Sequence, residues 1–286
     1  MEGRTLIDGL DIYTNYGMFV TNGGHDQIVA WPPLKAPAIN DWPDEDGIEV
    51  DLSHPVLDTK NALVTFAMMP GGSLAGFMAK ISDRAFHTFT FYEIGHEYHL
   101  RLLAQDSLKL RHDGQAFRFG LAFCDDFPNP YYSYLAPNGN APMQPYGIDG
   151  KSLSDYGIAV LQGTEAELKK SPPVKINLVR KFAKQPGALN DTGETASTYD
   201  GEFVYYKSKE VTLNCLLRAS DLTQFWRNYK ALLFDLIRPG ERLLMHPAIG
   251  TPKPCYYKNM NIVKLITQGE IWCRFNIVLE FTNYRY

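Results

Sequence analysis

The sequence lacks the features typical of exported proteins, of membrane-spanning proteins and of proteins stabilised by disulfides or zinc. Its four cysteines, Cys124, Cys215, Cys255 and Cys273, are dispersed and lack the paired spacing of a zinc site or a disulfide framework, so we expect them to be reduced and buried. No apolar run approaches the roughly 20 residues that span a bilayer. No signal peptide precedes the first patterned segment, so we expect the chain to be assembled in a cytoplasm.

The chain also lacks an excess of basic residues. Its formal net charge is -4, from 28 lysines and arginines against 32 aspartates and glutamates. Proteins that grip nucleic acid neutralise phosphates with lysine and arginine, so this balance argues against a nucleic-acid-binding surface. It leaves open a chain that encloses DNA without gripping it, because a neutral or acidic wall suits that role.

Catalytic and cofactor motifs are absent from the sequence. It has no G-x-S-x-G elbow, P-loop or dinucleotide fingerprint. His96 and His99 are three apart, and such positions on a strand point to opposite faces, so we do not expect them to share a metal ion. The adjacent carboxylates Asp125-Asp126 and Asp44-Glu45-Asp46 are expected in solvated turns. We therefore expect no catalytic residue, no cofactor and no metal site.

What the sequence does have is an internal repeat. Ile7-Asp8-Gly9, followed by Tyr16-Gly17, returns as Ile148-Asp149-Gly150, followed by Tyr156-Gly157. Behind each opening come a long loop, an Asp-Gly turn, an apolar strand, one amphipathic helix and an alternating closing strand, in the same order. Five features in matching order predict a tandem duplication with a period on the order of 140 residues, which is the size of a domain.

The repeat sets the expected domain boundaries. We predict domains at 1–127 and 146–286, joined at 128–145 by a linker that its prolines stiffen. The apolar strands are expected at 61–68 and 210–217, and the closing strands at 114–123 and 269–281. The chain has 286 residues and an apolar fraction of 45%, enough for a core in each domain.

Helical spacing appears once in each copy. Leu74, Phe77, Met78 and Ile81 follow the i, i+3, i+4, i+7 pattern, and a longer pattern of this kind runs from 222 to 236. The remaining segments read as short strands, including a strand pair over 10–20 and a strand over 28–31. The expected fold is therefore mainly β with one helix per domain (α+β), as two tandem antiparallel β-barrel or sandwich domains.

Two long loops, 32–47 and 162–199, carry opposite charge, and loops of this length usually have a function. The first contains Asp41, Asp44, Glu45 and Asp46. The second contains Lys169, Lys170, Lys175, Arg180, Lys181 and Lys184. Trp31 and Trp42 flank or lie in the first loop, where they either pin it to the surface of its own domain or dock on a neighbouring subunit.

The linker also carries the tyrosines Tyr131, Tyr132 and Tyr134. These side chains either lie along the domain that the linker crosses or form a stacking platform for sugars or bases. No basic residues accompany them in the linker, so the first interpretation is preferred.

The repeated unit, with many short strands, one helix, long loops between the early strands and no catalytic set, resembles the tail-tube fold of tailed bacteriophages and contractile injection machines. The opening at 7–20, the Trp-containing acidic loop and Asp46-Gly47-Ile48-Glu49-Val50-Asp51-Leu52 resemble distal tail and baseplate-hub proteins most. The tandem copies resemble hub proteins with two tube domains in one chain. The resemblance covers nearly the whole chain as a pattern of elements rather than through one short motif.

That resemblance implies a non-enzymatic tail component without a cofactor. It implies a homo-oligomeric ring, trimer or hexamer, around the tail channel, in contact with neighbouring tail-tube or baseplate proteins. DNA would be passing cargo only, no membrane would be involved, and the place would be the virion tail after assembly in the host bacterial cytoplasm. The opposite charges of the two long loops also predict head-to-tail pairing, in which the first domain of one chain contacts the second domain of its neighbour. The alternative is a carbohydrate-binding or adhesive tandem β-sandwich protein, favoured by an aromatic content of 13% and the linker tyrosines.

Overall fold

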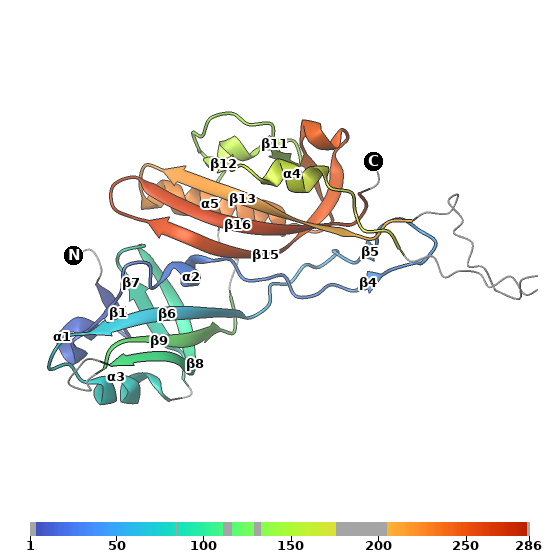
Figure 1. Ribbon diagram of the computed structural model, residues 1–286. Coiled ribbons are helices and arrows are strands. Elements are labelled where there is room, and N and C mark those ends of the chain that lie inside the picture. The colour runs from blue at the N-terminus through green and yellow to red at the C-terminus, as the bar shows by residue number, and fades with distance from the viewer. Residues whose placement is uncertain (1–3, 84, 111–115, 129–132, 176–204, 285–286) are drawn as a thin grey trace, which may run out of the picture.

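The structure is a computed structural model that describes residues 4–83, 85–110, 116–128, 133–175 and 205–284. The chain is mainly β, of the α+β class: every strand pair is antiparallel, and the strands form two seven-stranded sheets and one two-stranded sheet. In Figure 1 the first sheet lies below the second, and the two-stranded sheet extends to the right between them.

The two seven-stranded sheets have the same strand order. The first runs β2-β1-β7-β8-β9-β6-β3 and the second β11-β10-β14-β15-β16-β13-β12. The strands of the first sheet are β1 (Thr5–Ile7), β2 (Leu10–Asp11), β3 (Met18–Val20), β6 (Lys60–Met68), β7 (His87–Phe91), β8 (His96–Leu110) and β9 (Ala116–Asp125). Those of the second are β10 (Gly147–Ile148), β11 (Lys151–Ser152), β12 (Ile158–Val160), β13 (Lys209–Ala219), β14 (Arg242–Met245), β15 (Lys253–Ile266) and β16 (Ile271–Phe281). Each strand of one sheet therefore has a counterpart in the other.

The two predicted helices are α3 (Leu74–Ile81) and α5 (Leu222–Leu236). Ser73 and Asp221 cap them by accepting a hydrogen bond from a backbone N–H three residues on, as N-cap residues do. The described residues contain further short helical turns, so each half has more than the one helix expected. These are α1 (Ile12–Tyr16), α2 (Asp26–Val29), α4 (Thr164–Lys169) and the 3-10 turns η1 (Leu153–Tyr156) and η2 (Pro247–Ile249).

Two segments that the sequence predicts as strands contain helical turns; of the pair expected over 10–20, only the two ends are strands, β2 and β3. Between Leu10 and Val20 the chain forms α1, whose first turn is held by the side chain of Asp11. The apolar run over 28–31 belongs partly to α2, so Ile28 and Val29 are buried as part of a helical turn. Short apolar runs do not distinguish a strand from a buried helical segment by themselves.

The repeated Ile-Asp-Gly motif forms the same hairpin turn in both halves. Asp8 and Asp149 both have φ 50°, and the glycines that follow them have φ 80° and 83°. A two-residue hairpin of this kind needs positive φ at both central positions, which is why Asp-Gly recurs there. The motif that recurs in the sequence therefore forms the same type of turn in both sheets.

The core includes buried residues of both halves and uses the alternating strand faces that the sequence predicts. Phe275, Ile277, Leu279 and Phe281 of β16 are all buried. In β9 the alternating side chains Phe119, Leu121 and Phe123 are buried. All four cysteines are buried and free, as expected for reduced residues. Within the described ranges, no helix combines the length and the hydropathy needed to cross a bilayer.

Candidate functional site

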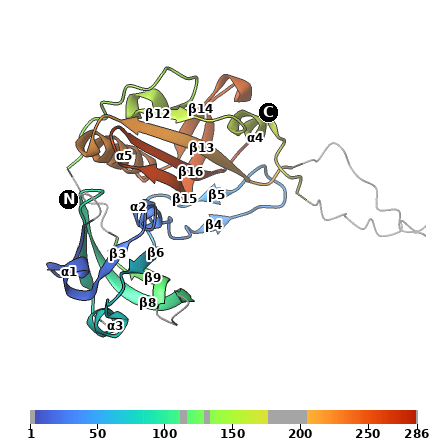
Figure 2. The same ribbon diagram turned by 60° about the vertical axis from the view of Figure 1, so that its left-hand side comes forward.

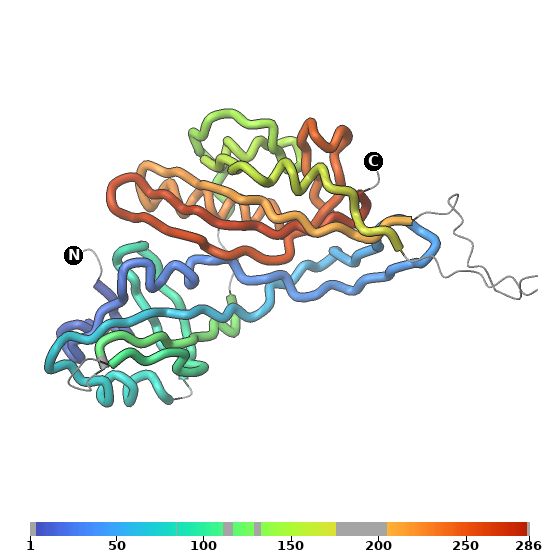
Figure 3. Tube along the Cα trace, viewed as in Figure 1, coloured from blue at the N-terminus to red at the C-terminus, as the bar shows by residue number. Residues whose placement is uncertain are grey.

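The two halves meet where a segment of the first half lies along an open edge of the second sheet. β14 pairs with β15 only as far as Cys255, so within the described ranges the rest of that edge of β15 has no strand of its own sheet beside it. The backbone N–H of Leu34 donates to the carbonyl of Lys258 at 2.7 Å. The side-chain amide of Gln27 donates to the carbonyl of Ile262 at 3.1 Å. Strand edges leave backbone groups unpaired, and this segment satisfies the carbonyls of Lys258 and Ile262. Figure 3 shows the segment running beside β15.

We call the contact between the segment 26–34 and the edge of β15 the joint. Trp31 lies at its apolar centre. Only 5% of its surface is exposed, and its ring lies 4.8 Å from Tyr229, 5.9 Å from Tyr257 and 6.2 Å from Phe275 between centroids. The hydroxyl of Tyr229 donates to the carbonyl of Val29 at 2.8 Å. Trp31 therefore pins its segment to the second half of the same chain, rather than to its own domain or to a neighbouring subunit.

The joint continues along an arm that ends in the hairpin of β4 (Ile39–Asn40) and β5 (Glu49–Val50), which reaches along the second half (Figure 2). The N–H of Ile48 donates to the carbonyl of Thr282 at 2.9 Å, and the N–H of Gly240 donates to Leu52 at 2.8 Å. Trp42 lies in this arm and is 49% exposed. The arm thus belongs to the first half by sequence and to the second by contact.

The acidic and basic loops meet within one chain. Lys175 is buried and lies 2.7 Å from the carboxylate of Asp41, and its ammonium also donates to the carbonyl of Trp42 at 2.6 Å. The other described lysines of the basic loop, Lys169 and Lys170, pair with glutamates of their own helix. Arg180, Lys181 and Lys184 lie outside the described residues. The acidic and basic loops were expected to attract each other between neighbouring chains; at Lys175 the ion pair with Asp41 forms within one chain instead.

A cavity of about 520 Å³ lies beside the joint and is lined by both halves. Trp226 of α5 stands in its wall, 4.4 Å from the ring of His96 and nearly perpendicular to it. The indole N–H of Trp226 donates to the carbonyl of Ile94 at 2.7 Å. Trp226 is only half-buried, at the margin of the helical face, so it joins the two halves rather than filling the core.

Burial shifts the pKa values of Lys60, Asp125 and His96, which line the cavity, toward favouring their neutral forms. It lowers the pKa of Lys60 to about 7, against the attraction of Asp125, and raises the pKa of Asp125. It also lowers the pKa of His96 to about 4, with Lys230 and Lys60 adding to the effect. Lys60 donates to the carbonyl of Ile28 at the end of α2. The polar groups here fasten the wall, and Asp125 is not in the solvated turn that the sequence suggested.

The other candidate groups have structural partners. His99 lies 3.1 Å from the hydroxyl of Thr88, whereas His96 contacts the ring of Trp226, so the two imidazoles have different partners. Asp126 accepts two hydrogen bonds from Arg101, at 2.8 and 2.9 Å. No group of three or more potential metal ligands occurs among the residues that the structure describes.

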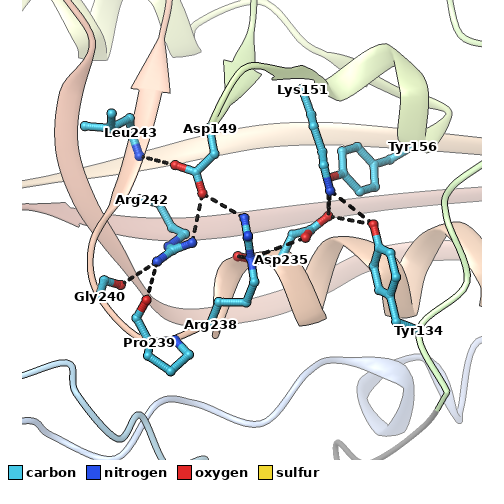
Figure 4. Close-up of polar contacts among 10 residues, drawn as sticks. All are labelled: Tyr134, Asp149, Lys151, Tyr156, Asp235, Arg238, Pro239, Gly240, Arg242 and Leu243. Atoms are coloured by element: carbon cyan, nitrogen blue, oxygen red, sulfur yellow. Dashed lines mark hydrogen bonds and ion pairs between the residues drawn. The ribbon is translucent and has the colours of Figure 1, made fainter.

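A second polar cluster anchors the hairpin turn of the second half (Figure 4). Asp149 accepts from the N–H of Leu243 at 2.8 Å and pairs with Arg242 at 2.9 Å and Arg238 at 3.0 Å. In the first half Asp8 has the matching contacts, with the N–H of Thr88, with His87 and with Lys80. The carboxylate of the repeated motif thus binds the next strand of the sheet in each half, and also Lys80 of α3 in the first half and Arg238, just beyond α5, in the second.

Beside it, the buried carboxylate of Asp235 collects three donors from separate elements. The hydroxyls of Tyr156 and Tyr134 donate at 2.5 and 3.2 Å, and the ammonium of Lys151 lies at 2.9 Å. These hydrogen bonds outweigh burial, so the pKa of Asp235 is lowered. Tyr134 therefore ties the linker to α5, as one of the two interpretations expected, while Tyr131 and Tyr132 lie outside the described residues.

The sequence contains a further repeat, in the segment that forms the joint, which was not among the features used to predict the duplication. Pro32-Pro33-Leu34-Lys35 returns as Pro172-Pro173-Val174-Lys175, 140 residues on. Lys60 likewise has a counterpart in Lys209, whose ammonium donates to the carbonyl of Leu168 at 2.9 Å. The Pro-Pro-x-Lys signal was available in the sequence, and a residue-by-residue alignment of the two copies would have found it.

Comparison with solved structures yields a structural similarity, whereas the other two comparisons yield no match. No family model matches the chain. No curated protein matches it either. Among solved structures it is similar to the Dit protein (gp 19.1) of SPP1, described as a paradigm of the hub adsorption apparatus in phages that infect Gram-positive hosts, with 12% identity over 97% of both chains and a TM-score of 0.31. A TM-score this low does not establish a shared fold.

Proposed function

We propose that this protein is a structural, non-enzymatic component of a phage tail or a related injection machine, a distal tail or baseplate-hub protein that forms a ring around the channel. The observation that carries the proposal is the joint between the halves. It is a contact between two unlike surfaces, the segment 26–34 on one copy of the unit and the edge of β15 on the other copy.

A head-to-tail contact between copies of one unit is the geometry from which rings are built. Such heterologous contacts continue from copy to copy until the rotation closes them into a ring. The matching strand orders give each half counterparts of both surfaces. One chain therefore holds two consecutive units, and its free surfaces are those at which the series would continue.

The remaining details follow from the same proposal. The two units are domains at 1–127 and 146–286 with a linker at 128–145, and three or six chains form the ring. Neighbouring tail-tube or baseplate proteins stack on it, and DNA passes through without being gripped, which suits the net charge of -4. The protein acts in the virion tail after assembly in the host cytoplasm.

The test is the mass of the particle in solution as a function of protein and salt concentration, with negative-stain imaging of the largest species. We expect a mass of three or six chains and a ring with a central hole. Surface ion pairs contribute little individually, about 0–1 kcal/mol, so salt should slow assembly more than it abolishes it. A chain that remains monomeric at high concentration and shows no ring contradicts the proposal.

The aromatic wall of the 520 Å³ cavity favours the adhesive alternative. Trp226, Tyr98 and Phe86 all line this cavity, and aromatic faces are a common feature of small-molecule sites. Binding to a glycan array by a monomeric protein, lost in Trp226→Ala, would support this second function over the first.

A further inference from the structure

The first sheet has an open edge where the second has its joint. β7 pairs only with residues 96–100 of β8, so the remaining part of that edge, 101–110, has no strand beside it in the described ranges. Residues 103–110 are all exposed, including Leu103 at 44%, Leu108 at 46% and Leu110 at 55%. Exposed apolar strand edges invite pairing with another chain.

This edge and the covered edge of β15 are counterparts. β7 stops pairing with β8 at Leu100, and β14 stops pairing with β15 at Cys255. Three residues later each strand has a bulge, at Leu103 and at Lys258, where no residue of the next strand is opposite. The carbonyl of Lys258 accepts the hydrogen bond from Leu34 across the joint, so Leu103 occupies the corresponding acceptor position.

The segments that would lie on these edges are counterparts as well. In the first half Leu34 faces Leu57 in an isolated bridge, and in the second Val174 faces Tyr206. The bonds of both bridges come from the flanking residues, such as Lys35 N–H to Val56 at 2.8 Å and Lys175 N–H to Tyr205 at 2.7 Å. The N–H of the central residue is therefore directed away from its bridge partner, and in Leu34 it reaches β15.

Val174, the central residue of the second segment, makes no such contact with a strand edge among the described residues. Val174 is 46% exposed, and among the described residues no hydrogen bond from its N–H is found. Leu34, in contrast, packs against the core. The second half thus presents a donor segment, and the first half presents an open acceptor edge.

We propose that residues 172–175 of one chain bind the edge of β8 at Leu103 in a second copy of this chain, repeating between chains the joint that Leu34 and Lys258 form within one. The inference rests on the proposed ring and names the surfaces that close it. The occupant is a second copy because, in the part of the chain that the structure describes, the corresponding segment of the first half covers the corresponding edge of the second.

The joint between chains is weaker than the joint within one. Ser171 stands where Trp31 fills the aromatic cage, and Glu167 stands where Gln27 donates to the strand edge. The backbone contact is retained while these two side-chain contacts are not. Assembly therefore depends on protein concentration, although the two halves of each chain remain attached.

Disulfide trapping tests the proposed contact. Leu103→Cys and Val174→Cys are made as separate variants; the four native cysteines are buried and do not compete. Residues bonded across a joint lie within the Cα separation that a disulfide spans, about 4.4–6.8 Å. We expect a mixture of the two variants to give a covalent dimer on mild oxidation, and the double variant to give longer linked series.

A matched pair of charge variants tests the same surface without cross-linking. Leu103→Asp should abolish assembly at a concentration where Leu243→Asp, an equally exposed leucine on β14, assembles as the parent chain does. Equal melting temperatures of the two variants show that the effect is on association. The mass of the assembly that the parent chain forms under the same conditions shows whether a failed contact also means that no ring forms.

If the parent forms rings while the mixture gives no cross-link and Leu103→Asp assembles normally, the proposed contact is wrong and the ring stands. If the parent remains monomeric and nothing is cross-linked, both proposals are wrong.

Discussion

Truncation of Trp31 should separate the contribution of the joint from that of the two cores. Trp31→Ala removes a ring that is 95% covered and touches three aromatic side chains of the second half. Buried tryptophan-to-alanine changes lower the free energy of unfolding by about 3–5 kcal/mol. The other core residues of both halves are unchanged in this variant, so we expect the lost stability to come from the contact between the two halves.

The indole N–H makes the expected size of the effect more specific. The Trp31 nitrogen is buried and has no hydrogen-bond partner among the described residues. A buried unsatisfied donor costs about 1–3 kcal/mol, so the parent chain already carries that penalty and Trp31→Ala relieves it. We therefore expect a loss near the lower limit, about 3 kcal/mol. Trp31→Phe keeps an aromatic ring in the cage and relieves the same penalty, so it should remain within about 1 kcal/mol of the parent.

The assay is urea unfolding followed by far-ultraviolet circular dichroism, with limited proteolysis in the absence of urea. Trp31→Ala should unfold at lower urea concentration, and protease should cut between the halves faster than in the parent or in Trp31→Phe. A loss below about 1 kcal/mol in Trp31→Ala, with unchanged proteolysis, would show that the joint does not depend on this ring and would refute the reasoning.

Two further predictions concern pH. The pKa of Lys60 is about 7 in the folded chain and about 10.4 when unfolded, so the unfolded state binds more protons between these values. Thermal melts should show the parent gaining stability over Lys60→Met from pH 7 to 10, by up to about 4 kcal/mol, and a constant difference would contradict the burial of a neutral amine. The pKa of Asp8 is lowered to about 2, because hydrogen bonds from Lys80 and His87 outweigh burial. Its contribution is present above pH 4 and lost toward pH 2, so Asp8→Asn should be about 1–2 kcal/mol less stable than the parent at pH 6 and nearly equal near pH 2; a difference that does not shrink on acidification argues against the clamp.

The sequence by itself determined the repeated architecture. The Ile-Asp-Gly motif requires positive φ at Asp8 and Asp149, so its recurrence marks the same turn twice. Alternation over 269–281 and helical spacing over 222–236 predict β16 and α5, because these patterns reflect which face of a local element is buried. Fold class and the order of the elements follow from such local signals.

Local signals failed where a short segment had several satisfactory conformations. The run over 28–31 is apolar enough for a strand, and α2 forms there because a carbonyl at the end of the helical turn accepts a hydrogen bond from the buried amine of Lys60. That partner is 32 residues away in the chain. No periodicity within the run itself reports it.

Only the tertiary structure decided how the two copies are joined. Trp31 lies in a cage built from residues about 200 positions later, and Lys175 pairs with Asp41 inside the chain rather than between chains. Residue type predicts that a tryptophan is buried and that a lysine seeks a carboxylate, but not which surface supplies the partner. That choice depends on how the arm of the first half crosses to the second, where long-range contacts outweigh local preference because the open edge of β15 leaves backbone groups that the arm can satisfy.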